Sequence, residues 1–173
     1  MADYYPGEIL IGGRLVVTDE NRESVEMFLE LFEDESDEYG GGKYGKIAIE
    51  NLSDNLNENG HLVVRDDSAR YGEFEGIEEF CRDLGLSYDR YSSPRYEYEG
   101  VLELHRPDAT REVCITDNSS RYLNEEQIGK IIDELDDQTD ASLANRIAAA
   151  KRKRDELLCL DVEDLPRLEI VEG

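Results

Sequence analysis

The chain has 173 residues and carries 43 acidic side chains against 19 basic ones, a formal net charge of −24. Such an excess repels nucleic acid and anionic membranes and favours a basic protein partner, so we expect no direct nucleic-acid or membrane binding. No segment approaches the roughly 20 apolar residues that span a bilayer. Residues 1–6 have neither the basic nor the apolar region of a secretory signal, so we expect none. We therefore expect a cytoplasmic protein of a bacterial or archaeal host cell.

The N-terminal residues predict a strand followed by a helix. Residues 8–17 are rich in β-branched side chains, and Gly12 and Gly13 within them indicate a bulge or a close backbone approach. Thr18 is a typical helix cap. The apolar residues that follow recur at i, i+3, i+4 and i+7, which predicts an amphipathic helix ending near Phe32.

An acidic loop is predicted after this helix. Residues 33–42 combine five acidic side chains with three glycines, a composition typical of a loop. Residues 46–50 predict a second strand. A turn at 59–60 then leads into a third strand at 61–64.

Helical and extended patterns alternate through the rest of the chain. Residues 74–84 have one apolar helical face and are followed by Gly85, a typical residue at a helix C-terminus. Asn124 is a typical cap for a third helix. The remaining predicted elements are strands at 88–91, 96–105 and 111–116, a longer helix at 139–160 and a short strand at 167–171.

This order of elements predicts an α+β fold. We expect a split βαβ core of the ferredoxin-like type, with antiparallel strands and C-terminal helices. Residues 1–122 would form the core domain. Residues 123–173 would form a helical extension packed on that core, within one domain overall.

No segment has the spacing of a catalytic or metal-binding motif. Gly12 and Gly13 continue a strand, whereas a phosphate would need a helix N-terminus behind them. The histidines, His61 and His105, belong to separate predicted strands, and the three cysteines lie too far apart for a zinc site. We predict no cofactor, no metal and no enzymatic activity. An enzyme would require a pocket with converging polar groups, which only a structure reveals.

Two segments suit contacts with other proteins. Residues 88–98 hold four tyrosines and two arginines, residue types that are enriched at interfaces, and Tyr91 and Arg95 are the candidate contact residues. The same tyrosines would also fit a strand packed on the core, so both interpretations stay open. Residues 151–154 are basic and lie on a predicted helix with an apolar stripe. That stripe would dock on the core or on a second copy, and a homodimer through this helix is one expected assembly.

Two blocks of sequence resemble known proteins. Residues 9–15 are similar to the opening strand of small uncharacterised proteins from phages and integrative elements, and residues 73–90 resemble a second block of such proteins. The resemblance carries no catalytic assignment. It implies a role in mobile-element biology, where small acidic proteins inhibit host defence. Anti-CRISPR and antirestriction proteins that imitate DNA are examples.

The leading hypothesis is therefore a non-enzymatic inhibitor that places carboxylates where a CRISPR effector or nuclease expects phosphates. DNA carries one charge per about 1.7 Å of its axis, so a mimic needs acids aligned along one face. Two candidate strips exist in the sequence. The first contains Glu26, Glu30, Glu33, Asp34, Glu35, Asp37 and Glu38, and the second contains Asp133, Glu134, Asp136, Asp137 and Asp140.

The alternative hypothesis is a structural or adaptor protein that binds its partner through the Tyr/Arg segment 88–98. Its charge would then reflect solubility or adaptation to a salt-rich cytoplasm. The low lysine content relative to arginine is compatible with such an adaptation.

Overall fold

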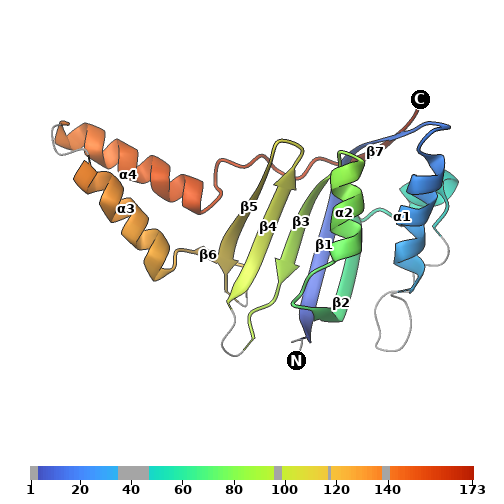
Figure 1. Cartoon of the computed structure of the whole chain (residues 1–173), viewed down its shortest axis with the longest axis horizontal. Coiled ribbons are helices and arrows are strands. Elements are labelled where there is room, and N and C mark those ends of the chain that lie inside the picture. The colour runs from blue at the N-terminus through green and yellow to red at the C-terminus, as the bar shows by residue number, and fades with distance from the viewer. Residues whose placement is uncertain (1–3, 35–46, 96–98, 117, 138–140) are drawn as a thin grey trace.

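A computed structural model describes residues 4–34, 47–95, 99–116, 118–137 and 141–173 (Figure 1). Within these residues the chain forms seven strands, four α-helices and one 3-10 helix. In chain order these are β1 (Tyr4–Val17), α1 (Arg22–Asp34), the 3-10 helix η1 (Ile49–Asn55), β2 (Leu62–Arg70), α2 (Glu75–Asp83), β3 (Ser87–Ser92), β4 (Gly100–Arg106), β5 (Ala109–Ile115), β6 (Arg121–Tyr122), α3 (Glu125–Asp137), α4 (Leu143–Leu157) and β7 (Leu168–Glu172).

Six strands form a path in the order β2-β1-β3-β4-β5-β6, and all neighbours on this path are antiparallel. The seventh strand, β7, runs parallel to the second half of β1. The predicted combination of helices with an antiparallel sheet is confirmed. None of the helices in the described part of the chain has both the length and the apolar character needed to cross a membrane.

The ferredoxin-like arrangement as a whole is not confirmed. One split unit is present, because α2 connects β2 to β3 and these strands flank β1, which runs opposite to both. The second unit is missing, because β2 ends the path and none of the described residues between α1 and β2 forms the strand that would pair with its outer edge. The physical reason lies in residues 46–50, where we predicted a strand. The Asn51 side chain accepts a hydrogen bond from the backbone N–H of Ala48 at 2.7 Å, and η1 begins at Ile49.

The main core lies where α1, α2 and η1 cover β1 and β2 (Figure 1). The apolar face predicted for α1 is fully buried in it: Val25, Phe28, Leu29 and Phe32 are at most 1% exposed. Reciprocal hydrogen bonds between Thr18 and the residue three positions later cap this helix, as the sequence predicted.

A second, smaller core covers the opposite face of β4 and β5. It consists of Leu102, Leu104, Val113 and Ile115 with Cys159 from the segment after α4. Successive side chains of a strand point to opposite faces of the sheet. Leu102 and Leu104 therefore face the second core, whereas the residues between and after them on β4 face α2.

The predicted close backbone approach at Gly12 and Gly13 is confirmed. A Cβ atom on Gly12 would lie 1.9 Å from the carbonyl oxygen of Pro166, and Gly13 has a φ of +108°. The pairing of β1 with β7 starts at Gly13. The two glycines therefore allow the C-terminal segment to cross β1 and then run beside it.

Helices α3 and α4 pack on each other and extend away from the β6 edge of the sheet (Figure 1). We call this pair of helices, residues 125–137 and 143–157, the arm. Asn124 caps α3, as predicted, and Ser142 caps α4. No described side chain of α3 is buried, and Ala149 is the buried residue of α4. We predicted that residues 123–173 pack on the core. Within this range, the segment that follows the arm packs on the sheet.

Candidate functional site

A hollow with a volume of about 280 Å³ lies between α1 and η1. Glu26, Glu30 and Glu50 line it together with an apolar floor that includes Leu29 and Ile47. Its volume falls just below the roughly 300–1,000 Å³ of small-molecule sites. Its size and its three carboxylates suit one long cationic side chain better than a cofactor.

The local sequence explains why these glutamates meet. On α1 the buried positions face the core, so Glu26 and Glu30, one turn apart, share the exposed side. Glu50 comes from the first turn of η1, whose buried residues Ile49 and Leu52 hold it against the same core as α1. Two of the three residues were predicted; Glu50 was missed because its segment was assigned to a strand.

The hollow carries an excess of negative charge. One cation is close: a guanidinium nitrogen of Arg22 lies 3.9 Å from a carboxylate oxygen of Glu50, at the limit of an ion pair, and the two side chains are 43% and 78% exposed. Such a pair contributes little. A second cationic group in the hollow would therefore relieve the repulsion among the three carboxylates.

The other predicted acidic residues are not brought to this site. Glu33 and Asp34 end α1, whereas Glu35, Asp37 and Glu38 lie outside the described residues. Asp133, Glu134, Asp136 and Asp137 lie on α3, at the opposite end of the molecule from α1 (Figure 1), and Asp140 lies outside the described residues. The two predicted strips are thus separate surfaces and do not form one continuous ridge.

The Tyr/Arg segment divides between packing and the surface. Tyr91 is half-buried and packs against the second core. Arg95 is exposed and donates a hydrogen bond to the carbonyl oxygen of Tyr4 at 2.7 Å. Tyr88 and Arg90 are buried. For these two, packing on the core is the interpretation that the structure supports.

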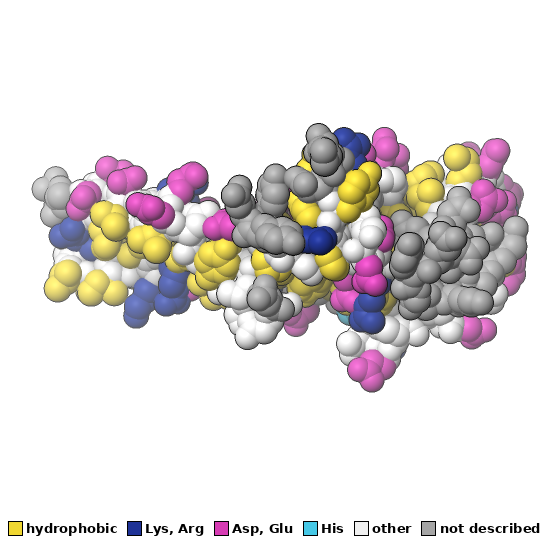
Figure 2. Space-filling view, turned by 90° about the horizontal axis from the view of Figure 1, so that it is seen from below, with side chains coloured by type: hydrophobic (Ala, Val, Ile, Leu, Met, Phe, Trp, Pro, Cys, Tyr) yellow, Lys and Arg dark blue, Asp and Glu magenta, His cyan; other side chains and the backbone are white. Residues whose placement is uncertain are grey.

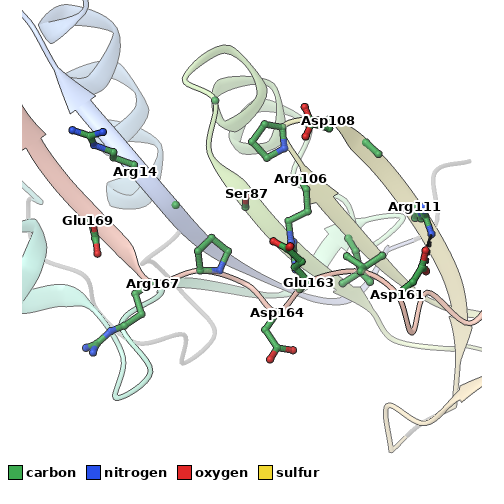
Figure 3. Close-up of a pocket in the computed structure, with 17 residues that line it drawn as sticks. Arg14, Ser87, Arg106, Asp108, Arg111, Asp161, Glu163, Asp164, Arg167 and Glu169 are labelled. Carbon is green, nitrogen blue, oxygen red and sulfur yellow. Dashed lines mark hydrogen bonds and ion pairs between the residues drawn. The ribbon is translucent and has the colours of Figure 1, made fainter. Parts of the chain in front are cut away.

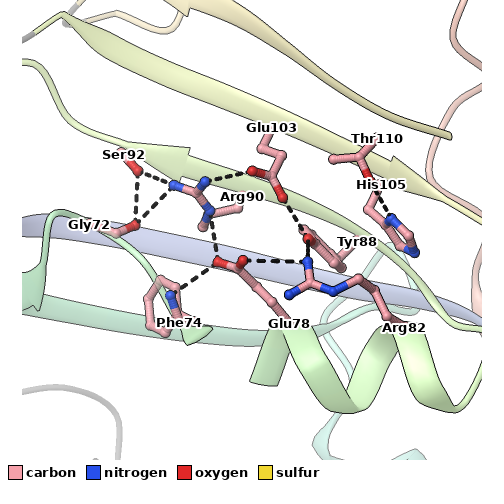
Figure 4. Close-up of polar contacts among 10 residues, drawn as sticks. All are labelled: Gly72, Phe74, Glu78, Arg82, Tyr88, Arg90, Ser92, Glu103, His105 and Thr110. Carbon is pink, nitrogen blue, oxygen red and sulfur yellow. Dashed lines mark hydrogen bonds and ion pairs between the residues drawn. The ribbon is translucent and has the colours of Figure 1, made fainter. Parts of the chain in front are cut away.

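Tyr88 and Arg90 belong to a buried polar network between α2 and the sheet (Figure 4). The Arg90 guanidinium lies between two glutamates, 2.9 Å from Glu78 and 2.7 Å from Glu103. The Tyr88 hydroxyl donates to Glu103 at 2.5 Å and accepts a hydrogen bond from Arg82 at 2.8 Å. Because these ion pairs and hydrogen bonds join side chains of α2 to side chains of β3 and β4, we assign the network to holding α2 on the sheet.

The network shifts several pKa values in opposite directions. Burial raises the pKa of Glu78 although Arg90 opposes that effect. Burial also acts to raise the pKa of Glu103, but hydrogen bonds from Tyr88 and Arg90 outweigh it, and the pKa is lowered. The pKa of Glu112, which faces Glu103 across the strands, is raised by burial and by the charge of Glu103.

A larger groove of about 770 Å³ lies between the β4–β5 turn and the segment that leads to β7 (Figure 3). Two of its arginines are paired with acids: Arg111 contacts both carboxylate oxygens of Asp161 at 2.8 Å, and Arg106 contacts Asp89 at 2.7 Å. Arg14 and Arg167 point away from its middle. The groove lacks a converging set of polar groups that would define a reaction or a ligand.

The described part of the chain contains neither an assembled metal site nor an activated thiol. No group of three or more potential metal ligands comes together there. The three cysteines are free thiols. Burial raises the pKa of the Cys114 thiol to about 11, with a smaller contribution from Glu99, so it is protonated at neutral pH.

Comparison of the chain with family models, with curated proteins and with solved structures finds no match.

Proposed function

We propose that this protein is a non-enzymatic inhibitor that binds a basic nucleic-acid-binding protein and occupies its DNA site. A CRISPR effector or a restriction nuclease of a host-defence system is the kind of partner that fits. The single observation that carries the proposal is the hollow between α1 and η1, in which three glutamates surround a space suited to one cationic side chain.

The exposed side of α1 extends the hollow into a short acidic strip. Glu23, Glu26 and Glu30 are all exposed, and at 1.5 Å per residue they span about 10 Å along the helix axis. One DNA strand places a phosphate about every 3.4 Å, so this strip matches roughly three phosphates. We therefore infer that the contact is local, with an arginine or lysine of the partner in the hollow and neighbouring cations along α1.

The net charge supports fast capture of such a partner. A molecule with a charge of −24 attracts a cationic groove over distances comparable to the Debye length, about 8 Å at physiological salt. Electrostatic complementarity of this kind acts mainly on the association rate and is lost as salt increases. Binding that did not depend on salt would contradict the proposal.

The experiment removes charge at the hollow while keeping the shape of its side chains. The variant Glu26→Gln, Glu30→Gln, Glu50→Gln should lose the retained partner when the immobilised protein is exposed to host extract. Wild-type protein should retain a nucleic-acid-binding protein that added duplex DNA displaces. A partner that tolerates the triple variant, or that DNA fails to displace, would refute the proposal.

A matched control removes the same amount of charge elsewhere. Asp67, Asp108 and Asp164 are exposed and lie outside the hollow. The variant with asparagine at these three positions should retain the partner as wild type does. If both triple variants lose it equally, net charge rather than the hollow is responsible.

One observation favours a second interpretation, adaptation to concentrated salt. The acidic side chains on α1 and α3 occupy opposite ends of the molecule, as general salt adaptation would produce (Figure 1). That interpretation predicts that the free energy of unfolding rises steeply with salt, since screening relieves self-repulsion. Circular dichroism during urea unfolding at low and high salt measures this.

A further inference from the structure

The arm has an apolar surface that the rest of the described chain does not cover. Ile128 and Ile132 on α3 are 47% and 52% exposed, and Leu143 and Ile147 on α4 are 70% and 44% exposed. Each pair is spaced i, i+4, so it occupies one side of its helix. Figure 2 shows hydrophobic side chains gathered along the arm. A contiguous apolar surface of this kind marks an interaction site.

Contacts within the arm do not require these four side chains. Helices α3 and α4 already pack on each other, and Arg146 joins them by donating a hydrogen bond to the carbonyl oxygen of Leu135 at 3.0 Å. Ala149 is buried in the arm. The pairing of the two helices therefore leaves these four side chains exposed.

The charges of the two helices indicate what covers this surface. Helix α3 carries six acidic residues and one basic residue, whereas α4 carries five basic residues and two acidic ones. Figure 2 shows acidic side chains along one border of the apolar surface and basic ones along the other. A nucleic acid would be repelled by α3, and a protein of uniform charge would match only one helix. A second copy of the arm matches both.

We propose that two copies of this chain associate through their arms, with α3 of each copy against α4 of the other. In such a twofold arrangement one contact surface serves both subunits, and four helices enclose the apolar side chains as in a helical bundle. The acidic border of one copy then faces the basic border of the other. This proposal is independent of the proposed inhibitor function, because the hollow lies at the other end of the molecule (Figure 1).

Molar mass in solution tests the association. The chain has a mass of 19.8 kDa, and light scattering coupled to size exclusion should give twice that mass for the wild type at high protein concentration. Salt of about 0.15 M screens the repulsion between two acidic molecules. The variant Ile132→Asp, Leu143→Asp should halve the measured mass. Both positions are exposed in the single chain, so circular dichroism should show unchanged folding.

Met27→Asp is the matched control, since Met27 is 53% exposed but lies on α1. This variant should keep the doubled mass. A wild type with the mass of one chain at every concentration would overturn the proposal. A doubled mass that survives in the arm variant would also overturn it.

Charge exchange between the helices tests the predicted pairing. Lysine at Asp133, Glu134, Asp136 and Asp137 changes the net charge of α3 from −5 to +3, and glutamate at Lys151, Arg152, Lys153 and Arg154 changes that of α4 from +3 to −5. Each variant alone should give a single-chain mass, because its two arms would repel. An equimolar mixture should recover the doubled mass, since each reversed helix then meets a complementary one. Doubled mass in each variant alone, or single-chain mass in the mixture, would refute the pairing of α3 with α4.

Discussion

The sheet with α1 and α2 differs from the arm in what covers its amphipathic helices. Helix α1 buries its whole apolar face in the main core, whereas α3 has no buried residue among those described. Both helices have clear apolar periodicity and capping residues at their N-termini. Local sequence therefore determines the helix and its apolar side, but the partner that covers that side comes from the topology of the whole chain.

The polar contacts of the two regions differ in the same way. In the sheet region, Arg90 is enclosed by two glutamates, and all three side chains are less than 10% exposed. In the arm, Arg146 is half-buried and donates one hydrogen bond to a backbone carbonyl. The first arrangement fixes α2 on the sheet, and the second only links two neighbouring helices.

The largest expected effect comes from removing the cation of the buried network. Arg90→Met should lower the free energy of unfolding by about 3–5 kcal/mol, because two buried carboxylates lose their partner. Arg146→Met in the arm should cost about 0.5–1.5 kcal/mol, the value of one ordinary hydrogen bond. Urea unfolding followed by circular dichroism measures both. Equal losses would remove the distinction between the two regions.

Truncation of an apolar side chain should lower the free energy of unfolding much more in the sheet region than in the arm, in the same assay. Phe28→Ala should cost about 3–5 kcal/mol, since Phe28 is fully buried and leaves a cavity. Ile132→Ala should change the stability of the single chain by about 0.5 kcal/mol or less. The measurement requires a concentration at which the chain is monomeric. A large loss for Ile132→Ala would show that the arm buries this side chain within one chain.

A smaller, pH-dependent effect is expected at Glu103. At neutral pH, Glu103→Gln should cost about 1.5–3 kcal/mol, because charge-assisted hydrogen bonds from Tyr88 and Arg90 are weakened. The folded-state pKa of Glu103 lies below its ordinary value of 4.5, so its contribution is complete above that pH and is lost as pH falls through the lower folded-state pKa. Unfolding curves of the two proteins should therefore converge in acid. A difference that grows as pH falls would contradict this sign.

Sequence patterns predicted much of the fold where signals were local. Helix α2 ends as expected: Gly85 has a φ of +66°, and the N–H of Leu86 donates to the carbonyl of Cys81. Strands β4 and β5 overlap the segments that were predicted as strands at 96–105 and 111–116. The segment at 46–50 was assigned wrongly because its alternating apolar residues fit a strand, whereas the asparagine that follows them favours a turn.

The candidate site was only partly predictable. The solvent side of α1 follows from helical periodicity, which gave Glu26 and Glu30. Glu50 depended on how a distant segment folds against α1. The burial of Arg90 was equally hidden, because its partners Glu78 and Glu103 come from a helix and a strand far apart in sequence.

The pairing of Gly13 with Leu168 has a consequence for the order in which this protein folds. These two residues lie far apart in sequence, so β1 cannot gain this neighbour until residues 168–172 have been synthesised. Such long-range contacts slow folding and leave an unpaired strand edge on the ribosome. The split unit of β1, β2, α2 and β3 can close first, which makes it the natural nucleus onto which β7 docks later.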